Sequence, residues 1–162
     1  MEHKFYTAYC DGSADNNNPL RPGGAAYVIF DSKGKEVKRA SKGFTDTTNN
    51  RMEMLAIISI VNYLPAYSWV TIHTDSQYCI KALLAKNPQA NLDQINHYRK
   101  IVFDKHLQVS FQWIRGHKGN KYNELCDRMA RGEYSKMLNE AEELYGGQIT
   151  TKNKRRCKSR KR

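Results

Sequence analysis

Hydrophobic and polar residues follow a strand-like pattern over the first 44 positions of the chain. Residues 4–10, 25–30 and 35–44 are rich in β-branched and aromatic side chains or alternate between apolar and polar. The polar segment 11–22 is crowded with Asn, Pro and Gly, and residues 31–34 are typical of a hairpin turn. Three successive strands with short links predict an antiparallel meander.

The hydrophobic period changes to that of a helix after residue 50. Met54, Ile57, Ile58, Val61 and Leu64 recur at helical spacing, and Pro65 ends the run. Beyond it, the pattern predicts strands at 69–74 and 107–114, and helices from about 76, at 91–106 and at 122–145. The order β-β-β-α-β-α-α-β-α predicts an α/β (mixed α+β) fold: a five-stranded mixed sheet, with an antiparallel meander plus parallel strands, flanked by helices.

The length and composition are those of an ordinary globular protein. The chain has 162 residues, 40% of them hydrophobic and 27% charged, which predicts one main domain and excludes wholesale disorder. The longest mainly apolar run, residues 55–61, is far shorter than the ~20 residues of a membrane-spanning helix. The first residues also lack the apolar stretch of a signal peptide. We therefore expect a soluble protein with no membrane partner. We also expect it to be a monomer.

The four cysteines, at positions 10, 79, 126 and 157, are widely separated and form no C-x-x-C pair. This spacing argues against a structural zinc site. Without a signal peptide it favours a reducing compartment, so we expect a cytoplasmic protein. The first three cysteines are interpreted as small hydrophobic residues.

The basic residues are concentrated at the end of the chain. The formal net charge is +11, and eight Lys and Arg residues lie within residues 152–162, without an acid among them. Such a block is typically disordered and binds polyanions, although a merely solubilising tail has the same composition. We expect a folded domain at residues 1–146 and a basic, disordered tail at residues 147–162.

Four acidic residues lie at unusual places in the pattern. Asp11 and Asp75 each follow a predicted strand, Glu53 lies in the first turn of a predicted helix, and Asp127 lies near the apolar face of the last helix. Alone, Asp75 is explained as a helix cap and Asp11 as a turn former. Carboxylates at the ends of neighbouring strands can converge in one crevice. Convergent acids repel one another unless a cation lies among them, and carboxylates select Mg²⁺ or Mn²⁺.

Four motifs together resemble ribonuclease H type 1, the enzyme family that hydrolyses the RNA strand of RNA/DNA hybrids. In chain order they are Asp11-Gly12-Ser13, residues 48–53 (TNNRME), residues 74–78 (TDSQY), and residues 116–120 (GHKGN) followed by 123–127 (NELCD). Each motif is short, but all four occur in the family's order within residues 5–135. The resemblance implies that residues 1–146 form a ribonuclease H-like catalytic domain.

The resemblance also implies roles for single residues. Asp11, Glu53, Asp75 and Asp127 match the residues that bind two Mg²⁺ ions, with Mn²⁺ as a substitute. By resemblance, Asp11 bridges both ions, Asp127 completes the ion that activates water, and Glu53 and Asp75 complete the ion at the leaving group. His117 matches a loop histidine that assists proton transfer or product release. Glu124 matches a position near the metal site, and its alternative role is to cap the last helix.

Further positions match the family's contacts with its substrate. Gly12, Ser13, Asn18, Asn50 and Gln77 match positions that line the RNA strand, and Thr48 matches a pocket for a DNA phosphate. Asn and Gln both donate and accept hydrogen bonds, which suits sugar hydroxyls and the minor groove.

One segment departs from the family pattern. Many bacterial members carry a Lys- and Trp-rich helical protrusion before the last strand. Here residues 86–106 contain no Trp and only four Lys or Arg residues, so we expect a reduced or absent protrusion. The hypothesis for residues 152–162 is that they replace part of it as an electrostatic arm for the hybrid, and that they also bind DNA or RNA nonspecifically.

These observations predict an endoribonuclease that cleaves the RNA strand of RNA/DNA hybrids by two-metal-ion catalysis, leaving 5′-phosphate and 3′-hydroxyl ends. Two alternatives remain at this point. One is a non-catalytic nucleic-acid-binding module of the same fold, which the complete set of four acids disfavours. The other is a DNA-acting polynucleotidyl transferase, which the motifs at residues 48–53 and 116–120 disfavour.

Overall fold

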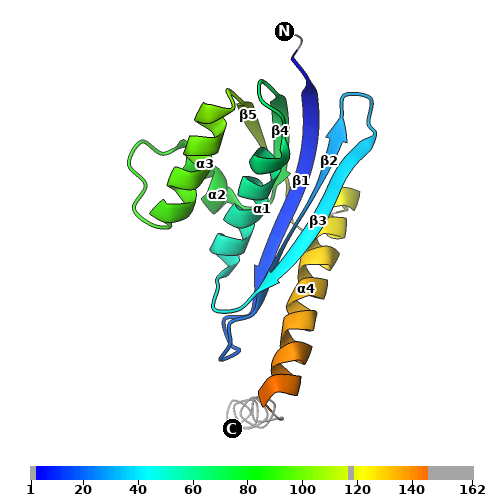
Figure 1. Ribbon diagram of the computed structural model, residues 1–162, viewed down its shortest axis with the longest axis vertical. Coiled ribbons are helices and arrows are strands. Elements are labelled where there is room, and N and C mark those ends of the chain that lie inside the picture. Colours follow the sequence, from blue (N-terminus) through cyan, green and yellow to red (C-terminus); the bar gives the residue numbers. More distant parts are fainter. Residues whose placement is uncertain (1–2, 117–118, 146–162) are drawn as a thin grey trace.

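A five-stranded mixed sheet forms the centre of the protein (Figure 1). The structure, a computed structural model, describes residues 3–116 and 119–145. The strands are β1 (Phe5–Ala14), β2 (Gly23–Asp31), β3 (Glu36–Phe44), β4 (Trp69–Thr74) and β5 (Gln108–Trp113), in the spatial order β3-β2-β1-β4-β5. The first three pair antiparallel, whereas β4 is parallel to both β1 and β5. The predicted fold class is confirmed.

Four described helices cover the two faces of this sheet. They are α1 (Asn49–Tyr63), α2 (Gln77–Leu84), α3 (Leu92–Asp104) and α4 (Lys121–Tyr145). α1 packs on β1 and β2, with α3 packed against α1, while α4 packs on β1, β2 and β3 from the opposite side (Figure 1). None of the described helices is long and apolar enough to cross a membrane.

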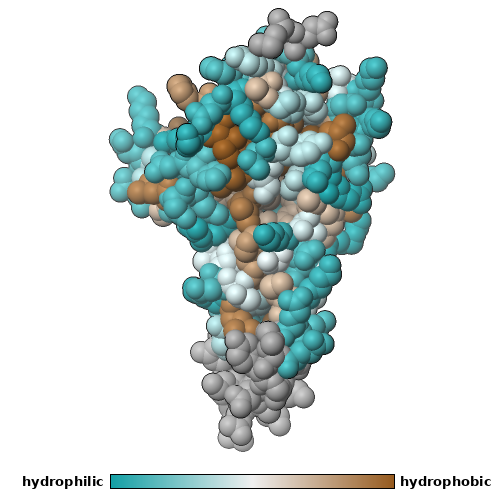
Figure 2. Space-filling model, viewed as in Figure 1, coloured by the Kyte–Doolittle hydropathy of each residue, from teal (hydrophilic) through white to brown (hydrophobic). Residues whose placement is uncertain are grey.

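β2 is buried on both faces because it lies between the two helix layers. Ala25, Tyr27 and Ile29 join the core beneath α1, and the alternate residues Ala26, Val28 and Phe30 pack with Cys126 and Ala130 of α4. This explains its nearly continuous apolar sequence. On the surface, hydrophilic side chains predominate, and hydrophobic ones gather in a few small patches on the face shown in Figure 2.

Local side chains set where the helices begin. The Thr48 hydroxyl accepts a hydrogen bond from the Arg51 amide at the start of α1. The Ser76 hydroxyl accepts one from the Cys79 amide at the start of α2. The Asn120 side chain accepts two, from the amides of Tyr122 and Asn123, at the start of α4. Each side chain satisfies amides that the first helical turn leaves without an internal partner.

The structure corrects three details of the predicted elements. β1 continues to Ala14 rather than ending at residue 10, because residues 12–14 pair with residues 23–25 of β2. The cap of α2 is Ser76 and not Asp75. The predicted helix 91–106 is shorter, since Asn91 and His106 adopt left-handed backbone conformations with φ of 54° and 51°.

The parallel pairing of β1 with β4 brings two acidic residues of these neighbouring strands close together. Tyr9 lies opposite His73 in the register, and Asp11 and Asp75 each come two residues later in the chain. Cys10, Cys79 and Cys126 are buried free thiols, as expected for small hydrophobic residues. Cys157 and the predicted tail at 147–162 lie outside the described residues.

Candidate active site

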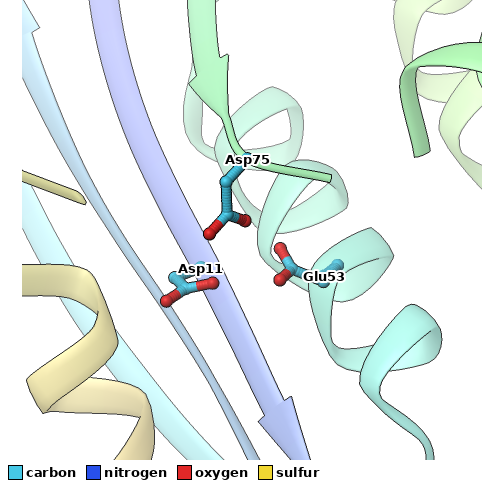
Figure 3. A group of neighbouring side chains, drawn as sticks. All are labelled: Asp11, Glu53 and Asp75. Atoms are coloured by element: carbon cyan, nitrogen blue, oxygen red, sulfur yellow. The ribbon is translucent and has the colours of Figure 1, made fainter. Parts of the chain in front are cut away.

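Three carboxylates meet where β4 ends beside β1. Asp11 projects from β1, Glu53 from the first turns of α1, and Asp75 from the residue after β4, and all three point toward one another (Figure 3). One oxygen atom from each lies within 4.8 Å of the others. The structure therefore brings together three of the four acids that the sequence singled out.

Close backbone approach at Gly12 makes this meeting possible. A Cβ atom at position 12 would lie 2.3 Å from both the Glu53 nitrogen and the Met52 carbonyl carbon. Only a residue without a side chain allows α1 to lie directly against β1 here. The approach holds Glu53 beside Asp11. Gly116 is similarly close to Asp75, because its Cβ would lie 2.7 Å from the Asp75 Oδ2 atom.

Burial and mutual repulsion raise the pKa of two of these carboxylates, Asp11 and Glu53. The pKa of Asp11 is raised to about 7, mainly by burial and also by the charges of Asp75 and Asp127. Hydrogen bonds from Glu53 and the Gly12 amide act in the opposite direction. Burial, followed by the charge of Asp11, also holds the pKa of Glu53 well above its usual range. A cation among these oxygens would reverse both effects, since it favours the ionised forms.

The chemistry of the site fits a divalent cation. The Glu53 Oε2 atom is buried and has no hydrogen-bond partner, which is costly unless another group satisfies it. The donor set consists of three carboxylates, with no His or Cys among the described residues of the cluster. Such hard oxygen donors suit Mg²⁺ or Mn²⁺ better than zinc.

Asp127 lies close to the three carboxylates but outside their cluster. It is near enough to raise the pKa of Asp11, and its side chain is 19% exposed. The Arg131 Nε atom, one turn further along α4, lies 3.1 Å from the Asp127 Oδ1 atom. The carboxylate of Asp127 therefore lies at the edge of the site and forms an ion pair with Arg131.

The residues predicted to contact substrate differ in how deeply they are buried. Asn50 and Gln77 are exposed in the first turns of α1 and α2, whereas Thr48 is half-buried as the cap of α1. Asn18 is only 4% exposed, and its side chain accepts a hydrogen bond from the Leu20 amide. It stabilises its own loop in this structure, so its contact with RNA stays a prediction.

Three other predicted residues have different outcomes. Ser13 lies half-buried in β1 next to Gly12. Glu124 is exposed in the first turn of α4, where Asn120 provides the side-chain cap. His117 lies outside the described residues.

Trp113 is a residue that the sequence reasoning left without a role. Its indole Nε1 donates a hydrogen bond to the main-chain carbonyl of Asp75 at 3.2 Å, and 42% of the residue is exposed. The contact links the end of β5 to the residue that carries a site carboxylate. The available signal was a tryptophan at a strand end, three residues before the Gly116 motif.

Comparison with known proteins identifies the family. The family described as RNase H matches residues 3–135. Ribonuclease HI of Synechocystis sp. is 37% identical over 154 residues, covering 86% of this chain and 94% of the relative. Ribonuclease H of Nitratidesulfovibrio vulgaris is 39% identical, covering 83% and 92%, and that of Trichodesmium erythraeum is 37% identical, covering 76% and 85%. With its mixed sheet and convergent carboxylates, the chain belongs to the RNase H family.

Proposed function

We propose that this protein is a metal-dependent endoribonuclease that hydrolyses the RNA strand of RNA/DNA hybrids. The observation that carries the proposal is the meeting of Asp11, Glu53 and Asp75 beside the end of β4. Membership of the RNase H family and the names of its relatives support the same activity. The unsatisfied Glu53 oxygen supports a role for the cluster in binding metal.

The chain's own residues would hold the ions and keep the site in shape. Asp11, Glu53 and Asp75 would be the main ligands, and Asp127 would join them from α4. Two bound Mg²⁺ ions would supply an activated water and stabilise charge on the leaving 3′-oxygen, which gives 5′-phosphate and 3′-hydroxyl ends. Gly12 would keep Glu53 against Asp11, and the indole of Trp113 would hold the backbone of Asp75.

Side chains around the cluster would select the hybrid. Asn50 and Gln77 are exposed on two different helices, and their amides can donate to and accept from RNA 2′-hydroxyls. The Thr48 hydroxyl is half-buried at the start of α1, where helix amide groups favour an anion such as a DNA phosphate. We propose that these three residues position the two strands.

The direct test compares substrates and metals in one experiment. End-labelled RNA/DNA hybrid, single-stranded RNA and double-stranded RNA are incubated with Mg²⁺, Mn²⁺ or EDTA, and the products are mapped for their terminal groups. We expect cleavage of the hybrid's RNA strand with either ion, none with EDTA, and 3′-hydroxyl products. Cleavage in EDTA, or products with 2′,3′-cyclic phosphate, would contradict the proposed chemistry.

Asp11→Asn tests the cluster itself. The substitution keeps the shape of the side chain but removes a charge that a metal ligand needs, so we expect metal-dependent cleavage to be abolished. Hybrid affinity should stay within about tenfold of that of the original protein, since phosphate contacts supply most of it. Cleavage at a rate near that of the unsubstituted protein would show that the site is misassigned.

A further inference from the structure

An open groove of about 650 Å³ lies between β3 and α1. α1 packs on β1 and β2, and β3 is the edge strand of the sheet. The floor between them is formed by small or flat residues, Ala25, Tyr27 and Ala40. At one end, Tyr63 of α1 crosses to β3, where its hydroxyl donates to the Val37 carbonyl. The groove is therefore closed at that end and framed by packed elements.

The described lining of this groove is basic. Lys38 and Lys42 line its β3 side, and no acidic residue is among the described residues that line it. The Lys38 ammonium lies 5.7 Å from the centre of the Tyr63 ring, and that of Lys42 lies 5.4 Å from the centre of the Phe44 ring. Cations beside aromatic rings over an apolar floor are complementary to a ligand that is anionic and has flat apolar surfaces.

The spacing of the two lysines suits a polymeric anion. They lie four residues apart on the same face of β3, opposite Ile29 and Ala25 of β2. Four strand residues span about 13 Å, which equals the rise of about four stacked nucleotides at 3.4 Å each. Phosphates near both lysines would leave the intervening bases over the apolar floor and the aromatic side chains.

The groove lies two strands away from the carboxylate site. In the register of the sheet, Asp11 lies opposite Ala26 of β2, and Ala26 lies opposite Ser41 of β3, which lines the groove. From this level the groove extends along β3 in both directions, to Lys38 and to Phe44. Neighbouring strands lie about 4.8 Å apart, so an unpaired extension of a hybrid bound at the carboxylates is long enough to reach the groove.

We propose that the groove between β3 and α1 binds single-stranded nucleic acid, as an accessory site for an unpaired extension of the hybrid. The lysines would contact phosphates, and Phe44, Tyr27 and Tyr63 would contact bases. This goes beyond the proposed function and rests on it only for the duplex part of the ligand. It predicts that hybrids with a single-stranded end bind more tightly than blunt hybrids.

Matched lysine substitutions test the groove. The groove variant is Lys38→Gln with Lys42→Gln. The control is Lys33→Gln with Lys35→Gln, which removes the same charge from exposed positions of the same hairpin outside the groove. Fluorescence anisotropy in EDTA gives the Kd of a blunt hybrid and of the same hybrid with a six-nucleotide DNA extension at either end, at several salt concentrations.

With the unsubstituted protein and the control, we expect one of the two extensions to tighten binding about tenfold, as stacked bases do at other single-strand sites. The groove variant should lose that gain. Its slope of log Kd against log salt for the extended hybrid should fall by about 1.4 relative to the control, for two contacts at 0.7 each. Equal slopes in both variants, or no gain from either extension, would overturn the proposal and leave the lysines as charges that protect an edge strand.

A substitution that keeps the charge of the groove tests whether the extension occupies it. Ala40→Phe would place a ring in the open groove while keeping both lysines, so the gain from the extension should again be lost. Undiminished tightening by the extension in this variant would contradict occupation of the groove. Equal displacement of the extension by a hexaglutamate peptide would also overturn the proposal, since it would indicate a general anion site. Cleavage of the blunt hybrid in Mg²⁺ separately tests the proposed function.

Discussion

Asp11 carries an unfavourable charge in the metal-free protein. Burial raises its pKa to about 7, against about 3.9 in an unfolded chain. Between pH 4 and 7 the folded state therefore keeps a proton that the unfolded state has lost. The stability from this group is complete below pH 4 and is lost as pH rises through 7.

Asp11→Asn should remove this pH dependence. In EDTA at pH 8 we expect the variant to be more stable than the unsubstituted protein by about 2 kcal/mol, since one pKa unit corresponds to about 1.4 kcal/mol and Glu53 shares the effect. Near pH 4 the difference should vanish. Urea unfolding from pH 4 to 8 measures it. Saturating Mg²⁺ is the control, because metal binding to the native cluster should reverse the order of stability.

His117 remains a sequence-based assignment, since it lies outside the described residues. If it moves a proton or releases product without binding metal, His117→Ala should lower turnover roughly 10²-fold, a typical acid–base contribution. Metal affinity, measured by titration calorimetry, should be unchanged. A large loss of metal binding would show that the histidine is a ligand.

At the scale of elements, the contact between β1 and α1 depends on Gly12. Gly12→Ala would push a methyl group into the backbone of Met52 and Glu53, so the two elements must separate. We expect a loss of about 3 kcal/mol in the free energy of unfolding and a loss of cleavage, because Glu53 moves away from Asp11. Chemical denaturation and the hybrid assay measure the two effects.

Gly132 is the control for Gly12, because the same substitution at this position should stabilise the protein. It lies exposed in α4 with nothing near its side-chain position. Gly132→Ala should therefore stabilise the protein by about 0.5–1 kcal/mol through helix propensity alone. Similar destabilisation by both substitutions would contradict the close approach at Gly12.

At the scale of the whole molecule, the basic residues 152–162 are expected to add to the affinity for nucleic acid. Residues 152–162 contain eight Lys and Arg residues, and phosphate contacts each add about 0.9 to the salt slope of duplex binding. Truncation after Thr151 should weaken hybrid binding at low salt and flatten that slope. Turnover at saturating substrate should be unchanged, because none of the proposed metal ligands is removed.

The measurement is the Kd for hybrid and for duplex DNA at several salt concentrations, with and without the segment. Loss of a nonspecific contributor should weaken DNA binding as well, so that discrimination between hybrid and DNA improves. An unchanged salt slope would leave residues 152–162 with a solubilising role only.

The sequence alone determined the features that depend on neighbours in the chain. Hydrophobic period set the order of strands and helices, and the short motifs marked Asp11, Glu53 and Asp75, because local spacing reflects local geometry. The burial of Cys10, Cys79 and Cys126 was likewise predicted from residue type. The sequence indicated that the acids converge. The spacing of residues 11, 53 and 75 along the chain does not give the distances between them in space.

Only the tertiary structure decided features that depend on how distant segments pack. Pairing with β2 extended β1 past Cys10, although its Gly and Ser residues are typical of a turn. Loop packing buried Asn18, and α4 placed Asp127 in an ion pair at the edge of the cluster. The groove between β3 and α1 exists because a helix covers two strands and leaves the third open. Such features arise from contacts between residues far apart in the chain, and no local pattern encodes them.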